Sequence, residues 1–345
     1  MVKSLFDLRP KTDPRYLFAR DGELDSLVGD VKHREWTVLL GPRRVGKTSL
    51  ALCASRRTGI RTLYIDARET DDLKRALFNG LSSSSDTTVS GGVGFPVVPI
   101  SASLFVSRKK RKVGLDDVLG KAGNFALILD EAQWLKNPVG VSRLLAHIYD
   151  LYKGSISLIM TGSSVGVMQS LLNPGPKGAM FGRSMREMHI GKWRSPSTGI
   201  SFLKEGCKQE RVSYRLEDIE NAVDRLGGLP GWLTLFGNYY KDYRNFRRAF
   251  ELTIDQALKV VVDELESTSI LALGWQRQMM ILKVIANGEA SFSKLADETI
   301  LPDTVLNRHL KMLMRLEYVE KNEDGRYQIT DPVVREYLMR GGRNK

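Results

Sequence analysis

The sequence predicts an α/β fold: a parallel β-sheet with helices on both faces, followed by a helical lid and a small C-terminal domain. Four short apolar runs, separated by segments with helical spacing, lie at residues 36–40, 62–65, 125–129 and 156–160. Strands that alternate with helices form parallel sheets whose two faces are both covered. After residue 191 helical spacing dominates, which indicates that the chain leaves the sheet there.

The length predicts more than one domain. A chain of 345 residues is too long for a single core of ordinary size. We expect an α/β domain over 1–192, the helical lid over 193–268 and the C-terminal domain over 269–345. Within the first, residues 82–112 open with serines, continue with glycines and then alternate, which predicts an inserted hairpin or flap. The basic run at 108–112 is either an exposed loop or a patch that contacts anions.

The composition favours anionic partners inside the cell. Lys and Arg number 52 against 40 Asp and Glu, a net charge of +12, although a plain solvated basic face would explain the same excess. Cys53 and Cys207 are far apart and lack a CxxC partner, which argues against a zinc site or disulfide framework. Because no segment resembles a secretion signal or a membrane helix, we expect a cytoplasmic protein without membrane contact.

A glycine-rich motif follows the first strand and opens a helix. Residues 41–48 read Gly-Pro-Arg-Arg-Val-Gly-Lys-Thr and match G-x-x-x-x-G-K-[ST], the P-loop pattern. In this pattern backbone N–H groups surround phosphate oxygens, Lys47 reaches the β- and γ-phosphates, and Thr48 offers its hydroxyl to a metal. The predicted nucleotide-binding residues are Gly41, Pro42, Arg43, Arg44, Val45, Gly46, Lys47, Thr48 and Ser49.

Two adjacent carboxylates end the strand at 125–129. A buried strand has little structural use for Asp130 and Glu131 unless they face positive charge. Magnesium, a hard cation, suits Asp130 together with Thr48, and Glu131 would then act as general base toward water. The alternative is that the acid pair only caps the following helix.

Further candidates follow from position in the chain. Thr161 and Ser163 end the next strand and could touch the γ-phosphate or the attacking water, although helix capping by Ser163 or Ser164 explains the same residues. Arg183 and Arg186 lie just before an expected strand over 187–190, and Arg183, in preference to Arg186, is a candidate for sensing the nucleotide or for stabilising transition-state charge. The sequence contains no Asn-Lys-x-Asp guanine motif, which favours adenine. Pro230 could pack against the base or merely end a helix.

The C-terminal pattern predicts a winged helix. Helices are expected over 275–286, over 293–298 and after Pro302, then two β-stretches at 318–321 and 326–329, and a last helix to Arg340. The third helix carries Asn307, Arg308, Lys311 and Arg315 away from its leucine face, a stripe that would enter a DNA major groove with Lys321 or Arg326 on phosphate. Glu317, Glu320, Glu323 and Asp324 would repel phosphate. Winged helices also dock proteins, so duplex DNA and a protein partner both remain open.

With these residues assembled, the chain resembles the archaeal ATPase family within the STAND branch of AAA+-related P-loop proteins, and more distantly origin-recognition initiators. The residues that carry the resemblance are 18–24, 41–49, 129–133, 161–164, 182–183, 228–231 and 329–332. The resemblance implies an ATP-hydrolysing core, a helical lid and a winged helix. It also implies that Pro230 contacts the adenine and that the segment Phe18–Leu24, with Arg20, supports it. The long insertion and its basic end depart from the family.

These observations predict a magnesium-dependent ATP-binding and ATP-hydrolysing switch. ATP or ADP at the sheet and lid would alter the lid and so the exposure of the winged helix. The alternative is a DNA-binding regulator in which ATP is mainly structural, and a metabolic kinase is a weaker third reading. A nucleotide-dependent oligomer is a further expectation, in which an arginine could act within one chain or across two.

Overall fold

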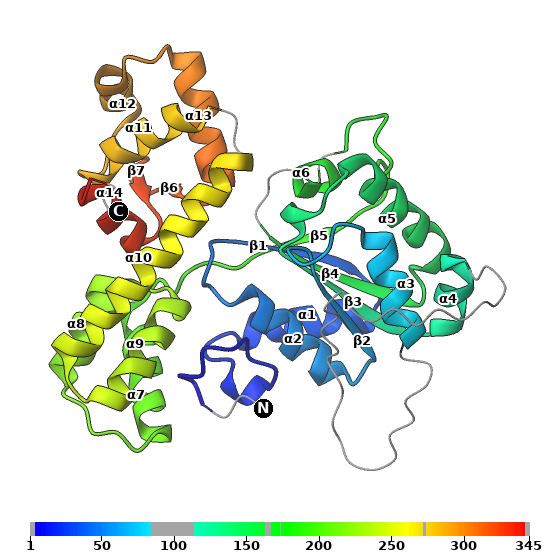
Figure 1. The fold of residues 1–345 in the computed structure, drawn as a ribbon, viewed down its shortest axis with the longest axis horizontal. Coiled ribbons are helices and arrows are strands. Elements are labelled where there is room, and N and C mark those ends of the chain that lie inside the picture. The colour runs from blue at the N-terminus through cyan, green and yellow to red at the C-terminus, as the bar shows by residue number, and fades with distance from the viewer. Residues whose placement is uncertain (1–3, 84–113, 163–166, 173, 272–273, 342–345) are drawn as a thin grey trace. The chain divides into compact units, whose positions relative to one another are not determined.

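The computed structural model describes residues 4–83, 114–162, 167–172, 174–271 and 274–341. The chain divides into two compact units, shown in Figure 1. The sheet unit comprises Pro10–Leu40 and Lys47–Ile190, and the helical unit comprises Met1–Arg9, Gly41–Gly46 and Gly191–Lys345. The predicted flap lies outside the described residues, apart from Ser82 and Ser83, which end a helix.

The sheet unit is built on five parallel strands in the order β2-β3-β4-β1-β5. The strands are β1 (Trp36–Leu40), β2 (Thr62–Asp66), β3 (Phe125–Asp130), β4 (Ile156–Gly162) and β5 (Arg186–His189). The first four correspond to the predicted apolar runs, and β5 corresponds to the strand expected after Arg186. The predicted parallel sheet is therefore confirmed.

Helices cover both faces of this sheet, as Figure 1 shows. One face carries α1 (Asp21–Lys32) and α2 (Lys47–Thr58). The other packs against α3 (Leu73–Ser83), α4 (Leu115–Ala122), α5 (Pro138–Tyr152) and α6 (Val167–Leu172). Two short 3-10 helices, η1 (Pro14–Tyr16) and η2 (Ala132–Trp134), complete the unit.

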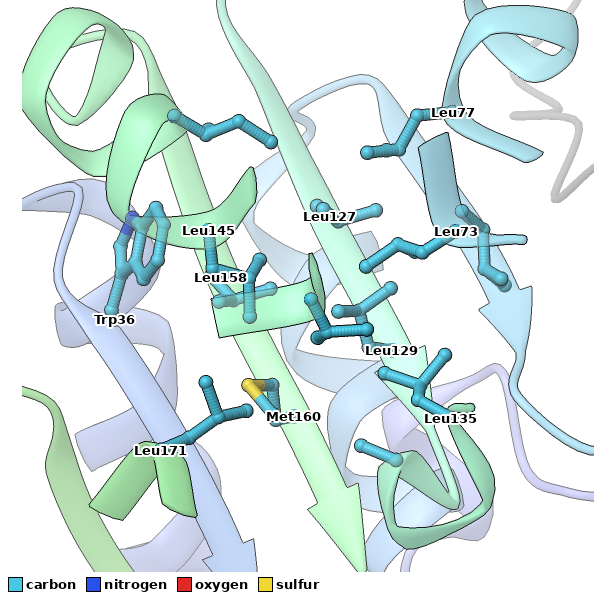
Figure 2. Close-up of a cluster of buried hydrophobic side chains, with 14 of the residues drawn as sticks. Trp36, Leu73, Leu77, Leu127, Leu129, Leu135, Leu145, Leu158, Met160 and Leu171 are labelled. Carbon is cyan, nitrogen blue, oxygen red and sulfur yellow. The ribbon is translucent and has the colours of Figure 1, made fainter. Parts of the chain in front are cut away.

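The main core lies between the sheet and α3 to α6. Alternate residues of β1, β3 and β4 point to this side, including Trp36, Leu127 and Leu158, which Figure 2 shows among leucines from the helices. The Trp36 indole N–H donates to the Ile156 carbonyl at 3.0 Å, so the largest core side chain leaves no buried donor unpaired. Because β1, β3 and β4 are parallel and in register, their carboxyl ends meet at one edge.

The helical unit begins with four helices: α7 (Pro196–Gln209), α8 (Leu216–Leu226), α9 (Pro230–Tyr243) and α10 (Phe246–Leu271). The first three pack against one another, and α10 packs against α9. Helix α10 is 26 residues long and continues past residue 268, where the Thr268 hydroxyl lies 2.9 Å from the Tyr318 hydroxyl. The predicted helical lid is confirmed.

The rest of the helical unit is a winged helix. It consists of α11 (Trp275–Ala286), α12 (Phe292–Thr299) and α13 (Asp303–Arg315), an antiparallel hairpin of β6 (Val319–Lys321) and β7 (Tyr327–Ile329), and α14 (Pro332–Met339). Leu306, Leu310 and Leu313 of α13 are fully buried, as their spacing predicts. Each predicted element is present, and the winged helix is confirmed. Among the described helices, none is both long enough and apolar enough to span a bilayer.

Both cysteines are free and buried, Cys53 in α2 and Cys207 in α7. Burial raises the pKa of Cys53 to about 12 and that of Cys207 to about 11. Since only the thiolate reacts with alkylating agents, we expect both thiols of the native protein to react with iodoacetamide at pH 8 at least about 100-fold more slowly than in the urea-denatured protein. Mass spectrometry of both samples measures this ratio. Rapid native labelling of either thiol would contradict its burial.

Candidate nucleotide site

Three hydroxyl groups converge on the Asp130 carboxylate at the carboxyl edge of the sheet. Asp130 ends β3 and is only 2% exposed. The Thr48 hydroxyl, from the first turn of α2, donates to its two oxygens at 2.9 and 3.0 Å, and the Tyr64 hydroxyl of β2 donates at 2.7 Å. The Thr161 hydroxyl of β4 donates to Oδ1. Side chains from α2, β2 and β4 therefore fix this carboxylate.

The oxygen atoms of Thr48 and Asp130 are of the kind that magnesium prefers. Thr48 and Asp130 bring a hydroxyl and a carboxylate oxygen within hydrogen-bond distance, and hard oxygens are the ligands that Mg²⁺ prefers. Across the described part of the chain, no group of three or more His, Cys, Asp or Glu side chains could hold a metal by itself. Mg²⁺ characteristically uses one or two protein oxygens and completes its shell with phosphates and water. Thr48 and Asp130 would be those protein ligands.

Glu131 is the first residue beyond β3 and has a left-handed backbone, with φ 53°. This conformation costs a non-glycine residue roughly 1 kcal/mol or more, so the surroundings must hold it. Its N–H donates to the Thr161 hydroxyl at 3.1 Å, and its Oε2 accepts from the Gln133 amide at 2.5 Å. The Thr161 hydroxyl thus contacts both acidic residues: it donates to the Asp130 carboxylate and accepts from the Glu131 backbone N–H. It is fully buried, which favours a positioning role over direct contact with phosphate.

Lys47 is the first residue of α2 and is 7% exposed. It follows directly on Gly46 and precedes Thr48, so the P-loop leads into α2 at this residue. Ser49, the next residue, accepts a hydrogen bond from the Lys11 N–H at 3.0 Å. Its hydroxyl therefore ties the N-terminal segment to α2 within the sheet unit.

Sequence reasoning missed Tyr64, Gln133 and Arg68 at this edge. Tyr64 bonds Asp130 because β2 lies next to β3, with Asp66 in register with Asp130. Burial, and then the Asp130 charge, raises the pKa of Tyr64, so it stays a protonated donor. The hydrogen bond to Asp66 is the main cause of the raised pKa of Arg68, with smaller effects of the Glu131 and Asp130 charges. Strand order, which no local pattern reveals, decides that Tyr64 and Arg68 lie near the two acids, whereas Gln133 bonds Glu131 from two positions along the chain.

Residues Gly41–Gly46 form the loop between β1 and α2 in the chain and cluster with the helical unit. Gly41, Arg44 and Gly46 have positive φ, at 145°, 68° and 95°. Alternation of backbone hand along such a loop turns successive N–H groups toward one concavity, the arrangement that binds phosphate. Val45 is buried, and the Arg44 carbonyl accepts a hydrogen bond from the Gly231 N–H at 2.9 Å.

The side chains of Arg43 and Arg44 contact acids of the helical unit. Arg43 Nη1 lies 3.4 Å from Glu264 Oε2, and Arg44 pairs with both Glu264 and Asp331. Their contribution to nucleotide binding stays a prediction, and with the side chains paired it would come from the backbone of the loop. Pro230 is the first residue of α9, directly before Gly231. It thus lies beside the residue that bonds the loop.

Arg20 precedes the first turn of α1 in the sheet unit and is buried. Its Nη1 donates to Glu23 Oε1 at 2.9 Å. This pair stabilises the start of α1, the helix that packs on α2. The support that the resemblance assigns to Arg20 stays a prediction.

Arg183 and Arg186 lie at the amino edge of the sheet, away from Lys47. Arg186 begins β5 and is in register with Thr37 near the start of β1, whereas the P-loop follows the end of β1. Arg183 pairs with Asp150 near the end of α5, with Nε to Oδ1 at 2.8 Å, and Arg186 pairs with Asp30. The role of Arg183 toward a nucleotide stays a prediction. Ser163 and Ser164 lie outside the described residues.

The winged helix exposes a basic face on α13, consisting of Asn307, Arg308, Lys311 and Arg315. Lys321 lies over the Tyr327 ring at 4.9 Å on the hairpin, and Arg326 is exposed beside it. Of the acids expected to repel phosphate, Glu320 is paired: Lys192 Nζ donates to it at 2.6 Å and Gln328 at 2.8 Å. This pairing reduces the repulsion that the sequence suggested.

Comparisons with known proteins bear on both parts. Residues 33–191 match the family described as an AAA domain, and residues 276–321 match the bacterial regulatory protein, arsR family. A Walker-type ATPase of Pyrococcus abyssi is 28% identical, with a TM-score of 0.78 over 97% of this chain and 99% of that chain. No curated protein matches the sequence. The AAA match implies nucleotide binding, and the resemblance to P-loop ATPases with a C-terminal winged helix is confirmed.

A more distant likeness concerns the fold alone. The ORC2 protein of Aeropyrum pernix, solved in ADPNP–ADP complexes, is 14% identical, with a TM-score of 0.65 over 98% of each chain. At that identity the shared feature is the fold alone. The agreement extends over nearly the whole length of both chains.

Proposed function

We propose that this chain, an AAA-type P-loop ATPase with a C-terminal helix-turn-helix region, is a magnesium-dependent ATP-hydrolysing switch whose winged helix contacts duplex DNA. The observation that carries the proposal is the arrangement of Thr48, Asp130, Thr161 and Glu131 at one edge of the sheet, next to Lys47. The basic face of α13 and the arsR-family match favour DNA over a protein partner.

In this proposal each residue has one task. The loop amides and Lys47 would bind the phosphates, and Thr48 and Asp130 would hold Mg²⁺, which would neutralise charge on the phosphate oxygens. Glu131 takes a proton from the attacking water while the water oxygen forms a bond to the γ-phosphorus. The bond between the γ-phosphorus and the β,γ-bridging oxygen breaks, and ADP and phosphate are the products. Thr161 positions Asp130 and Glu131, and Gln133 orients the Glu131 carboxylate.

Several finer assignments belong to the same proposal. Following the resemblance, Pro230 would contact the adenine, with Arg20 supporting the segment before α1. Arg183 would act only across a nucleotide-dependent oligomer, because it lies at the amino edge of its own sheet. The boundaries 1–192, 193–268 and 269–345 are proposed as the three functional domains.

Lys47→Ala tests ATP binding. We expect the Kd for MgATP, measured by calorimetry, to rise at least about 30-fold, because a charge-assisted contact to phosphate is lost. Lys32→Ala, an exposed lysine of α1 in the same unit, is the matched control and should leave the Kd unchanged. Equal affinities of Lys47→Ala and the parent would remove the P-loop from the proposal.

A second candidate is a DNA-binding regulator in which ATP is structural. The arsR-family match favours it, because a DNA-binding module needs no turnover. The two candidates differ in steady-state phosphate release with DNA present. Release no faster than that of the Lys47→Ala variant, together with intact ATP binding and DNA binding, would select the regulator.

A further inference from the structure

Arg44 of the P-loop is enclosed by three side chains of the helical unit. Its Nη1 lies 3.1 Å from Asp331 Oδ2, and its Nη2 pairs with Glu264 Oε1 of α10. Its guanidinium carbon lies 3.9 Å from the centre of the Trp232 ring of α9. The Arg44 side chain is only 12% exposed, so these contacts replace most of its water.

Asp331, one of these partners, belongs to the winged helix and caps α14. Its Oδ1 accepts from the Val333 N–H at 2.8 Å, the hydrogen bond of an N-cap residue. The Trp232 indole N–H donates to both carboxylate oxygens at 2.9 and 3.0 Å. Because Asp331 is buried, its charge needs a compensating cation, and Arg44 is the cation in contact with it. One carboxylate thus serves both the helix start and the P-loop.

The backbone of Arg44 is held as firmly as its side chain. Arg44 has φ 68°, and its carbonyl accepts from the Gly231 N–H at 2.9 Å. A Cβ on Gly231 would lie 2.6 Å from the Arg44 Cβ, so only glycine allows this approach. Arg44 lies three positions before Lys47. Contacts that fix Arg44 therefore fix the loop whose amides would surround the phosphates.

We propose that Arg44 is a positioning residue that couples the nucleotide site to the winged helix through Asp331. The Asp331 and Glu264 carboxylates hold the loop in its phosphate-binding conformation before the nucleotide arrives. Less conformational entropy is therefore lost when the nucleotide binds. By reciprocity, a nucleotide that holds the loop also strengthens the cap of α14. The coupling rests on the proposed ATP binding. It adds that the Arg44–Asp331 contact links ATP binding at the loop to the stability of the winged helix.

The test is a mutant cycle on nucleotide affinity. Asn caps helices as well as Asp, so Asp331→Asn removes the charge and keeps the cap. We expect Arg44→Gln and Asp331→Asn each to raise the Kd for MgATP at least about fivefold, and the double variant to raise it no further than the larger single effect. Glu336→Gln removes an acid of α14 that pairs only with Arg340 among the contacts seen in the described residues, and should leave the Kd unchanged.

Hydrogen exchange supplies a readout that general destabilisation would not give. In the parent, saturating MgATP should slow exchange of the Val333 and Arg335 amides, which bond Asp331, at least about fivefold. In Asp331→Asn, that slowing should be absent while the protein remains folded by circular dichroism. In Glu336→Gln, it should persist.

The outcomes separate this coupling from ATP binding itself. If the Kd of Asp331→Asn stays within twofold of the parent, or if the two single effects multiply, the coupling is overturned while ATP binding stands. If MgATP slows exchange equally in the parent and in Asp331→Asn, the path through Asp331 is likewise overturned. If the parent shows no heat of binding, the proposed function fails first, and the coupling with it.

Discussion

Glu131→Gln should lower steady-state ATP turnover by about 10²- to 10³-fold and leave the Kd for MgATP within about threefold of the parent. Glutamine preserves the side-chain shape but cannot accept a proton from water. The Glu131 backbone would remain fixed, because its N–H still bonds Thr161. Phosphate release measures the rate, and calorimetry measures binding.

Glu35→Gln is the matched control for this experiment. Glu35 directly precedes β1 at the amino edge of the sheet, where it pairs with Lys153 at 3.3 Å, and its loss should leave turnover unchanged. Turnover of Glu131→Gln equal to that of the parent would exclude Glu131 as the base. A loss confined to nucleotide affinity would instead show that the acid pair is structural, the capping alternative.

Removing Arg308 and Lys311 together should weaken binding of random-sequence duplex DNA by about 100-fold at low salt, since each charge-assisted phosphate contact accounts for roughly tenfold. The slope of log affinity against log salt should also fall by about 2, one unit for each lost phosphate contact. Both residues are exposed on the basic face of α13. Fluorescence anisotropy over a series of salt concentrations measures both quantities.

The control for net charge is Arg247→Ala with Lys259→Ala. These exposed residues of α10 carry the same total charge outside the winged helix. A similar loss with both pairs would indicate binding through overall charge. If neither pair changes the affinity, or if the parent binds no duplex at low salt, the winged helix does not use this face on DNA, and the protein-docking alternative is favoured.

Local patterns in the sequence were sufficient to predict most of the fold. The P-loop motif predicts a strand before it and a helix after it, and the structure has β1 and α2 at these places. The winged helix was predictable for a related reason: its helices are short, its leucine spacing is regular and Asp331 caps α14. Such patterns involve residues only a few positions apart, so they can be recognised without knowing how the rest of the chain folds.

Residues that meet only through strand order could not be predicted. Tyr64 and Thr161 both bond Asp130, but the sequence does not say that β2 and β4 flank β3. For Arg183, its place before a strand was visible, whereas its distance from the P-loop depends on the direction in which β5 runs beside β1. The partners of Arg44 lie 220 and 287 positions away in the chain (264 − 44 and 331 − 44), beyond any local pattern.

Helix α10 has a mechanical consequence. At 1.5 Å per residue, its 26 residues form a rod about 39 Å long, and it contains neither proline nor glycine, the usual sites of kinks. Tilting such a rod by 5° moves one end about 3 Å relative to the other. Glu264 lies 18 positions (264 − 246), about 27 Å, from Phe246 at the start of this rod, so a tilt that follows a small displacement of the arginines bound to Glu264 would move the far end of the lid.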